Sequence, residues 1–151
     1  MAVASFAAGC FWGVQADFDL LIGVKETVVG YTGGKMKEPC YEDVLTDTTG
    51  HAEAVQITYD AQSLTYSQLL IAFFNLHNPS TIPGQRYKYR STIFYHNKEQ
   101  KEISEGFLAE LNADNPYVLS IKTTIVQAST FYKAEAYHQK YYEKQGIKAL
   151  E

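Results

Sequence analysis

Apolar and polar residues along the chain follow two spacings, one typical of strands and the other of helices. Continuous apolar runs and period-two alternation predict strands over Ala2–Ala8, Val24–Thr32, His51–Tyr59, Arg90–Tyr95 and Tyr117–Val126. Apolar residues three and four positions apart predict helices over Val14–Ile22, Tyr66–His77, Lys98–Leu111 and Tyr132–Lys144, and a shorter helix is expected over Tyr41–Leu45. Because strands and helices alternate, we expect one domain over residues 1–151, of the α/β (α+β) class, with helices packed on one sheet.

The composition favours a soluble globular protein. Of the 151 residues, 46% are hydrophobic and 20% charged, and the formal net charge is −4. No polybasic run is present, which argues against a nucleic-acid partner. No apolar run reaches the ~18 residues that a membrane span requires, so no membrane association is expected.

The two cysteines, Cys10 and Cys40, are too few for a disulfide scaffold, so a reducing cytoplasm is the expected location. Residues Phe6–Cys10 are loosely similar to a bacterial lipoprotein cleavage site. However, no Lys or Arg precedes them and the apolar lead is short. The four histidines show no ligand-type spacing with one another or with the cysteines, so no metal site is expected.

The stretch Gly9–Gly13 (Gly-Cys-Phe-Trp-Gly) joins the first predicted strand to the first predicted helix. This context places Cys10 at or just before the first turn of the helix, where unpaired N–H groups and the helix dipole favour negative charge. We therefore predict a lowered pKa and a nucleophilic thiolate at Cys10, walled by Phe11 and Trp12. The alternative is a buried, inert cysteine.

Glu53 is the second candidate for chemistry. It lies in the predicted strand His51–Tyr59, on the face opposite Ala52 and Ala54, and the imperfect alternation there predicts a bulge near Glu53. If Glu53 points into a pocket, desolvation raises its pKa and lets it donate a proton near neutrality. The alternative is a solvated strand glutamate. Tyr41 and Tyr89, each at the start of a predicted element, are candidate hydrogen-bond donors to a substrate oxygen, although most of the 12 tyrosines must be structural.

Five segments taken together resemble the peptide methionine sulfoxide reductase A family, over most of the chain. They are Gly9–Gly13, Val29–Gly34 (Val-Gly-Tyr-Thr-Gly-Gly), Tyr41–Val44 (Tyr-Glu-Asp-Val), Gly50–Glu53 (Gly-His-Ala-Glu) and Tyr89–Ser91 (Tyr-Arg-Ser). The combination is highly specific, whereas the first motif alone is only moderately so.

The resemblance implies a ferredoxin-like core and the reduction of the S epimer of methionine sulfoxide, free or in proteins. Carried over by matching motif, Cys10 attacks the sulfoxide sulfur and becomes a sulfenic acid. Phe11 and Trp12 hold the substrate methyl group. Glu53 protonates the departing oxygen, to which Tyr41 and Tyr89 donate hydrogen bonds.

The chain departs from the family pattern in three places. After Gly146 it has no cysteine of the kind that recycles many relatives, and Cys40 stands before Tyr41 where Thr is usual. The segment before Tyr89 usually reads Asp-x-Gly-x-Gln, but here residues 83–88 hold no acidic residue. We expect Arg86 and Lys88 in this segment either to favour the Cys10 thiolate or to contact an acidic partner.

The missing recycling cysteines bear on how the sulfenic acid is reduced. We expect an external thiol, from glutaredoxin with glutathione or from thioredoxin, and no bound cofactor. The alternative is that Cys40 is the resolving thiol and forms a disulfide with Cys10. Some relatives carry selenocysteine at the nucleophile. The expected partners are oxidised proteins or free methionine sulfoxide and a thiol reductant protein, and the chain is expected to be a monomer or weak homodimer.

Two other functions are compatible with parts of the pattern. A cysteine hydrolase would pair Cys10 with a histidine, for which His51 is the candidate. A binding module would keep the fold and hold methionine-rich peptides without turnover. Both require the combination of motifs to be coincidental.

Overall fold

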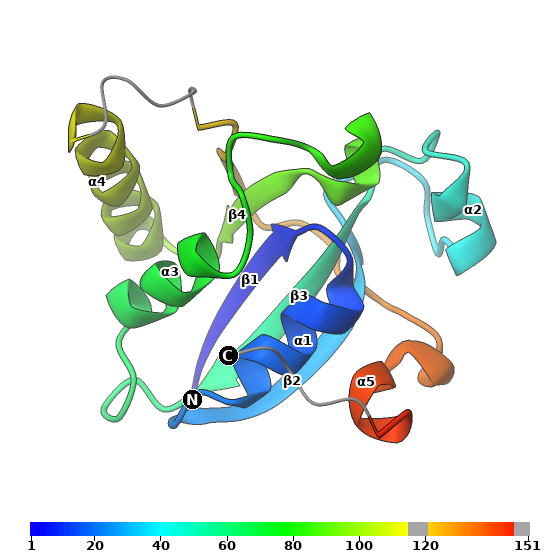
Figure 1. The fold of residues 1–151 in the computed structure, drawn as a ribbon, viewed down its shortest axis with the longest axis horizontal. Coiled ribbons are helices and arrows are strands. Elements are labelled where there is room, and N and C mark those ends of the chain that lie inside the picture. The colour runs from blue at the N-terminus through cyan, green and yellow to red at the C-terminus, as the bar shows by residue number, and fades with distance from the viewer. Residues whose placement is uncertain (115–120, 147–151) are drawn as a thin grey trace.

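A six-stranded sheet runs through the molecule in the computed structural model, which describes residues 1–114 and 121–146 (Figure 1). Its strands are β1 (Ala2–Ala8), β2 (Val24–Thr32), β3 (Ala52–Tyr59), β4 (Ser91–Tyr95), β5 (Thr124–Gln127) and β6 (Tyr132–Lys133). The order is β5-β4-β1-β3-β2-β6, with β4 and β5 parallel and the other pairs antiparallel. The central order β4-β1-β3-β2 is that of two interlocked β-α-β units, which confirms the predicted ferredoxin-like core.

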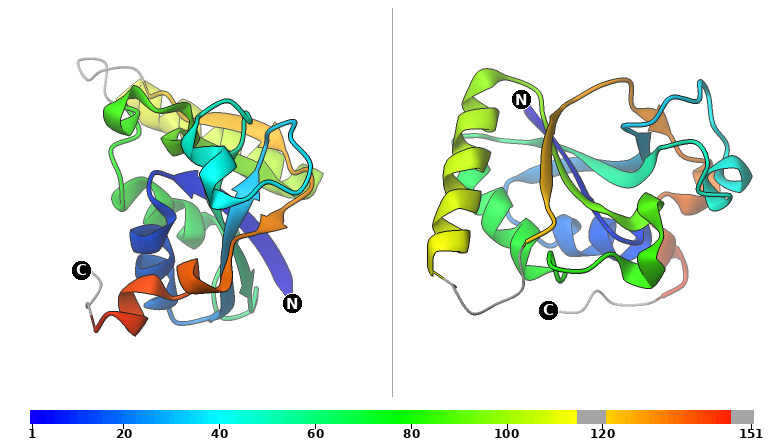
Figure 2. Two further views of the ribbon diagram at one scale, coloured as in Figure 1. Left: turned by 90° about the vertical axis from the view of Figure 1, so that its right-hand side faces the viewer. Right: turned by 90° about the horizontal axis from the view of Figure 1, so that it is seen from above.

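Two helices cover one face of the sheet. Helix α1 (Phe11–Asp19) follows β1, and α3 (Tyr66–Asn75) follows β3; both lie on the same face in Figure 1. Phe6 of β1 packs between them, with ring centroids 5.6 Å from Phe18 and 5.0 Å from Phe73. Helix α4 (Lys98–Asp114) lies beside α3 and against β4 and β5. The short helices α2 (Tyr41–Leu45) and α5 (Tyr141–Lys144) lie on the side of the molecule opposite α4 (Figure 2).

Helix α1 starts three residues earlier than predicted, at Phe11 rather than Val14, and ends at Asp19 rather than Ile22. Gly9, with φ of +99°, turns the chain out of β1, so that Cys10 itself is the N-cap and Phe11 joins the first turn. Ile22 is 90% exposed, so it lies outside the apolar stripe that packs on the sheet.

The predicted bulge near Glu53 is wrong. Strands β2 and β3 pair without a shift from Glu26–Thr58 to Thr32–Ala52, and the irregularity lies at the other end, between Val24 and Glu26. The alternation is imperfect because both faces of β3 are buried. Ala52 and Ala54 belong to a small cluster on one face, whereas other residues of the strand face the helices.

The predicted helix over Tyr132–Lys144 is also wrong. The segment starts as β6, continues as a 3₁₀ turn over Ala136–His138 and ends as α5, with Lys140 left-handed at φ of +55°. Gln139 explains this path, because its side chain hydrogen-bonds the backbone N–H and C=O of Val29 at the edge of β2. Tertiary hydrogen bonds therefore override the helical spacing.

The other predicted helices and strands agree with the structure to within a few residues, except the strand predicted over Tyr117–Val126, which is shorter because residues 121–123 are not part of a strand. The predicted strand Tyr117–Val126 appears as β5 at Thr124–Gln127, and residues 117–120 lie outside the described part. Within the described ranges, no helix combines the length and apolarity needed to cross a membrane.

Candidate active site

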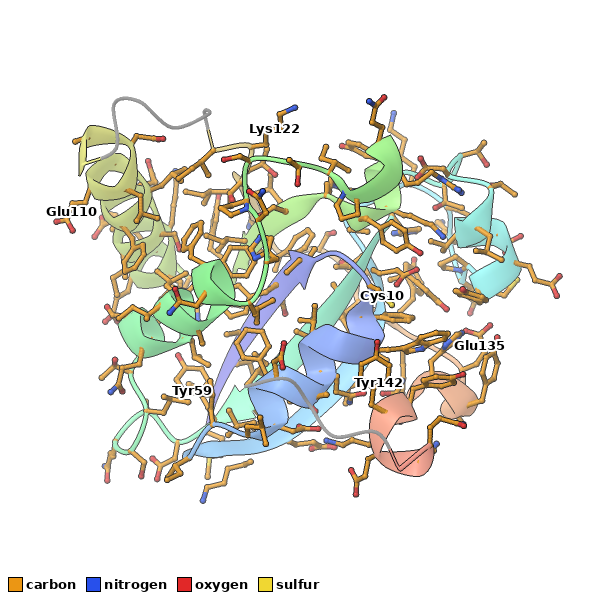
Figure 3. The ribbon with its side chains drawn as sticks, viewed as in Figure 1. Cys10, Tyr59, Glu110, Lys122, Glu135 and Tyr142 are labelled. Atoms are coloured by element: carbon orange, nitrogen blue, oxygen red, sulfur yellow. The ribbon has the colours of Figure 1, made fainter. Side chains whose placement is uncertain are left out.

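Cys10 lies at the turn from β1 into α1, on the side of the molecule where Glu135 is found (Figure 3). Its residue is exposed and its side chain makes no capping hydrogen bond. The backbone N–H groups of Trp12 and Gly13, in the first turn of α1, are close enough to the sulfur to favour its charged form. The sequence therefore placed this cysteine correctly at a helix start whose donors are available to it.

The prediction that this position lowers the Cys10 pKa is wrong. Although the residue as a whole is exposed, the side chains around its sulfur exclude part of the water there, and this desolvation raises the pKa of the thiol; the charge of Glu53 adds to the rise. The Trp12 and Gly13 N–H groups and the Lys88 ammonium oppose it without reversing it. In the substrate-free protein the thiol therefore keeps its proton at neutral pH, and forming the thiolate requires an acceptor.

Glu53 is a candidate acceptor, because it is bound to the first turn of α1 and its charge acts on Cys10. It is 1% exposed, and its Oε1 accepts a hydrogen bond of 3.3 Å from the backbone N–H of Phe11, next to Cys10. Its Oε2 has no hydrogen-bond partner among the described residues. Burial raises its pKa to about 7, although the Phe11 N–H and Lys88 lower it. Glu53 is therefore not a solvated strand glutamate.

Lys88 approaches Glu53 from a 3₁₀ turn, Tyr87–Tyr89. Its ammonium Nζ is 3.9 Å from Glu53 Oε2, and both side chains are buried. The same Nζ lies 4.6 Å from the centroid of the Tyr89 ring and 6.0 Å from that of Tyr41. A buried cation, a buried carboxyl group and two phenols thus share one small volume.

The two candidate tyrosines come from different elements and meet here. Burial raises the pKa of Tyr41, and it raises that of Tyr89 to about 12. When they are ionised, Glu53 and Cys10 add to both shifts, so the structure brings all four predicted catalytic side chains into one site. Both phenols remain protonated at neutral pH and can donate hydrogen bonds.

Phe11 and Trp12 differ in accessibility. Phe11 is 1% exposed, whereas Trp12 is half-buried and stacks on Tyr141 with ring centroids 3.8 Å apart. The Trp12 indole N–H donates a 2.9 Å hydrogen bond to Nδ1 of His138. Trp12 therefore offers the more accessible aromatic surface, and its orientation is fixed from two sides.

Glu135 connects two of the elements that form the site. Its two carboxylate oxygens accept 2.9 Å hydrogen bonds from the Tyr31 hydroxyl and from the backbone N–H of Tyr41. Burial opposes the charge of Glu135, but these hydrogen bonds lower its pKa overall. The start of α2, and with it Tyr41, is thereby tied to β2.

Cys40 is exposed, is the N-cap of α2 and forms no disulfide with Cys10. Its sulfur donates a 3.2 Å hydrogen bond to Asp43, and its backbone N–H donates to the same carboxylate. Arg86 contacts the end of α2: its guanidinium donates a 2.6 Å hydrogen bond to the carbonyl oxygen of Leu45 and lies 4.0 Å from the Asp47 carboxylate. Of the two basic residues in this loop, Lys88 is the one beside the Glu53 carboxyl group.

His51 is committed to the backbone of a neighbouring loop. Its ring nitrogens lie 3.0 Å from the N–H of Gly34 and 2.7 Å from the carbonyl oxygen of Met36. This leaves no ring nitrogen for Cys10 and disfavours the hydrolase alternative. In the ranges that the structure describes, no three His, Cys, Asp or Glu side chains gather as a metal site would require.

Sequence reasoning missed Glu135 and His138 as parts of the site. Both lie in the segment interpreted as a helix, so their contacts with β2, α1 and α2 were not foreseen. The sequence did mark position 88 as unusual, because Lys stands there in place of the Gln of the family pattern. Its burial against Glu53 could not be read from that substitution alone.

Comparisons with known proteins agree with this geometry. The family model for peptide methionine sulfoxide reductase matches residues 2–150. The chain is 47% identical to the peptide methionine sulfoxide reductase MsrA of Acidobacterium capsulatum over 97% of both chains. It is 48% identical to that of Methanococcoides burtonii, over 95% of this chain and 97% of the relative.

Solved structures show the same fold. The reduced form of Mxr1 from Saccharomyces cerevisiae superposes with a TM-score of 0.82 at 30% identity, over 96% of this chain and 86% of Mxr1. Methionine sulfoxide reductase A of Corynebacterium diphtheriae gives a TM-score of 0.82 at 28% identity, over 98% of this chain and 76% of that protein. The chain therefore belongs to the peptide methionine sulfoxide reductase family and is an enzyme that reduces methionine sulfoxide, a reaction of protein repair.

Proposed function

We propose that the chain reduces the S epimer of methionine sulfoxide through a sulfenic acid on Cys10, with Glu53 as the group that moves the proton. The observation that carries this proposal is the Glu53 carboxyl group. It is buried, anchored to the first turn of α1 beside Cys10, and has a pKa of about 7 and an unpartnered Oε2. A group with a pKa near the working pH both accepts and gives a proton readily.

The raised pKa of Cys10 defines the first step. Ionised Glu53 accepts the Cys10 proton, and the thiolate attacks the sulfoxide sulfur, forming a sulfur–sulfur bond. Protonated Glu53 then gives that proton to the sulfoxide oxygen, to which Tyr41 and Tyr89 donate hydrogen bonds. The hydroxyl group passes to Cys10 and methionine leaves. The substrate sulfur gains two electrons and Cys10 loses two, so one proton passes from thiol to oxygen without net uptake.

Substrate binding falls to the aromatic residues beside the thiol. The half-buried Trp12 ring, held by Tyr141 and His138, contacts the methyl group next to the reacting sulfur, and Phe11 backs this surface. An apolar wall of this kind selects a small alkyl group and leaves the polar oxygen to the other side of the site.

An external thiol completes the cycle. One thiol attacks the sulfenic acid, releasing water and forming a mixed disulfide, and a second thiol releases Cys10. The exposure of Cys10 supports access by a reductant. Saccharomyces cerevisiae Mxr1 forms a complex with Trx2, and thioredoxin or glutaredoxin with glutathione are the proposed reductants here. Cys40 serves as the alternative resolving thiol. We propose a single catalytic domain that acts in the cytoplasm as a monomer or weak homodimer.

A stereoselective assay tests the proposal. Dipeptides carrying the S or R sulfoxide are supplied with dithiothreitol, and methionine release is measured. We expect product from the S epimer and a Cys10 adduct with dimedone after a single turnover. Product from the R epimer alone, or an acyl-enzyme in place of a sulfenic acid, would overturn it. Binding of sulfoxide peptides without turnover would favour a binding module.

A further inference from the structure

Lys88 is a buried cation that the mechanism above does not use. Its side chain is 2% exposed, and that of Glu53, its partner at 3.9 Å, is 1% exposed. This separation is within ion-pair range but too long for a hydrogen bond. Burying an ammonium group is costly, and the attraction to a buried carboxylate often only offsets that cost. The stability of the fold alone therefore does not explain a buried cation here.

The backbone around Lys88 is fixed from the end of α2. The N–H groups of Tyr87 and Lys88 both donate 2.8 Å hydrogen bonds to the two carboxylate oxygens of Asp47. The Asp47 carboxylate thus holds the turn and leaves the Lys88 ammonium directed at Glu53. The pair is a built feature, since the loop that carries Lys88 is clamped by a second carboxylate.

We propose that Lys88 is a positioning residue that stabilises the ionised form of Glu53, both before Glu53 takes the Cys10 proton and after it has given that proton to the sulfoxide oxygen. This inference rests on the proposed function. In the first and last states of the proton transfer Glu53 is negative, and a cation 3.9 Å from Oε2 compensates that charge.

The other groups around the pair do not supply this charge. Besides Lys88, the titratable side chains that interact electrostatically with Glu53 are Cys10, Tyr31, Tyr41 and Tyr89. The Arg86 guanidinium acts on Tyr89 but donates its hydrogen bond to the carbonyl oxygen of Leu45. Burial raises the pKa of each of the three phenols and of the thiol, so all four are neutral in the free enzyme at neutral pH. The charge of Glu135, behind Tyr31 and Tyr41, is negative and is held by their hydrogen bonds.

The consequence is a tuned acid. Burial alone would push the pKa of Glu53 upward until it kept its proton at neutral pH, and Lys88 opposes that rise. Lys88 opposes the rise at Cys10 as well. Removing the cation therefore raises both pKa values, and the pH dependence of the reaction moves to higher pH.

The test compares Lys88→Met and Lys88→Gln with the native chain. Rates of single-turnover reduction of the S-sulfoxide dipeptide are measured across pH. We expect both variants to move the acid limb of the profile upward by about one pH unit or more, because an opposite charge within 4–6 Å lowers an acid's pKa by about that amount. The rate below that limb should fall about tenfold for each pH unit by which the limb moves, with little change in KM.

Three controls separate charge from structure. Lys101→Met removes an exposed cation that lies over the Tyr95 ring and belongs to α4, a helix that contributes no residue to the site, and should leave the profile unchanged. Lys88→Arg restores the charge and should return the limb to its native pH even if the rate is lower. Circular dichroism of each variant identifies any that do not fold, in which case the Gln and Arg forms carry the comparison.

A second readout separates this inference from the proposed function. The pH dependence of Cys10 alkylation by iodoacetamide is measured in a Cys40→Ser background, without any sulfoxide. We expect the alkylation midpoint to rise in Lys88→Met. If S-sulfoxide is not reduced, the proposed function fails and alkylation still tests the cation. Unchanged midpoints for both alkylation and reduction in Lys88→Met and Lys88→Gln would overturn the role of Lys88.

Discussion

Helices α1 and α3 begin at corresponding points of the two β-α-β units, yet their first turns are built differently. At the start of α3, Thr65 accepts a 3.1 Å hydrogen bond from the N–H of Gln68, and the Gln68 side chain accepts a 2.8 Å hydrogen bond from the N–H of Thr65. At the start of α1, Cys10 makes no capping bond, and the Phe11 N–H donates to Glu53 on another strand. The N–H groups at the start of α3 are satisfied by side chains of the same turn, whereas those at the start of α1 have no side-chain cap from their own turn.

The two cysteines repeat this contrast. Both are N-caps, Cys10 of α1 and Cys40 of α2. The Cys40 sulfur is occupied by Asp43 within the same turn, whereas the Cys10 sulfur faces the N–H groups of Trp12 and Gly13. A local partner stabilises a helix start, and the lack of one leaves donors for a substrate.

Exchanging each cysteine for serine gives the largest expected difference. Cys10→Ser should lower the single-turnover rate by at least about a thousandfold, because the hydroxyl group is a far weaker nucleophile, whereas Cys40→Ser should change it by less than about twofold. Reduction of the S-sulfoxide dipeptide with dithiothreitol measures both. Loss of multi-turnover activity by Cys40→Ser with glutathione and glutaredoxin would instead assign the resolving step to Cys40.

Glu53→Gln tests the β3 carboxyl group that accepts a hydrogen bond from the first turn of α1. The native rate should rise as pH increases through about 7, where Glu53 ionises and can accept the thiol proton, and should fall above the raised pKa of Cys10. The variant should lose the limb near pH 7 and about 10²–10³ in kcat, since Gln carries no proton to transfer. Glu42→Gln, on the exposed side of α2, is the matched control. A limb retained by Glu53→Gln would assign it to another group.

Trp12→Phe sharpens the comparison in the first turn of α1. The indole hydrogen bond to His138 is lost while the ring stacked on Tyr141 is kept. A lost hydrogen bond of about 1 kcal/mol corresponds to a rise in KM of about fivefold with kcat nearly unchanged. Steady-state kinetics measure both constants. An equal fall in kcat and kcat/KM would place the contribution of Trp12 in the transition state instead.

Thr65→Ala should have the smallest effect on function. Removing the cap of α3 should cost about 1 kcal/mol of folding free energy, because the Gln68 N–H loses its acceptor. Denaturant titration measures this cost, and kcat should stay at the native value. A matching loss of activity would show that α3 is coupled to the site and would break the contrast between the two helix starts.

Much of the fold was accessible from the sequence. Strands β1 and β2 appear with the predicted bounds, and β3 begins one residue later, because long apolar or alternating runs bounded by glycine leave few alternatives. The segment after Tyr132 was not accessible, since its path follows the Gln139 contacts with Val29 and not its own spacing. Pairing of β6 with the edge strand β2, together with the Gln139 hydrogen bonds, outweighs the helical preference of this segment.

The candidate site divides in the same way. The glycine turn before α1 indicated Cys10 from local chemistry, and the strand pattern placed Glu53 opposite two alanines. The pairing of Phe6 with Val55 then carries Glu53 to the Cys10 end of β1, a long-range fact that no local pattern contains. The direction of the Cys10 pKa was wrong for this reason: the helix start favours the thiolate, but burial by residues from other elements outweighs it.

The sequence by itself determined which residues can do the chemistry, because nucleophile, acid and hydrogen-bond donors are properties of side chains and of the turns that hold them. Only the tertiary structure decided their protonation states and partners. A pKa depends on the water that neighbours exclude and on the charges within a few ångströms, here the Lys88 ammonium beside Glu53, and both are set by packing between segments distant in the chain.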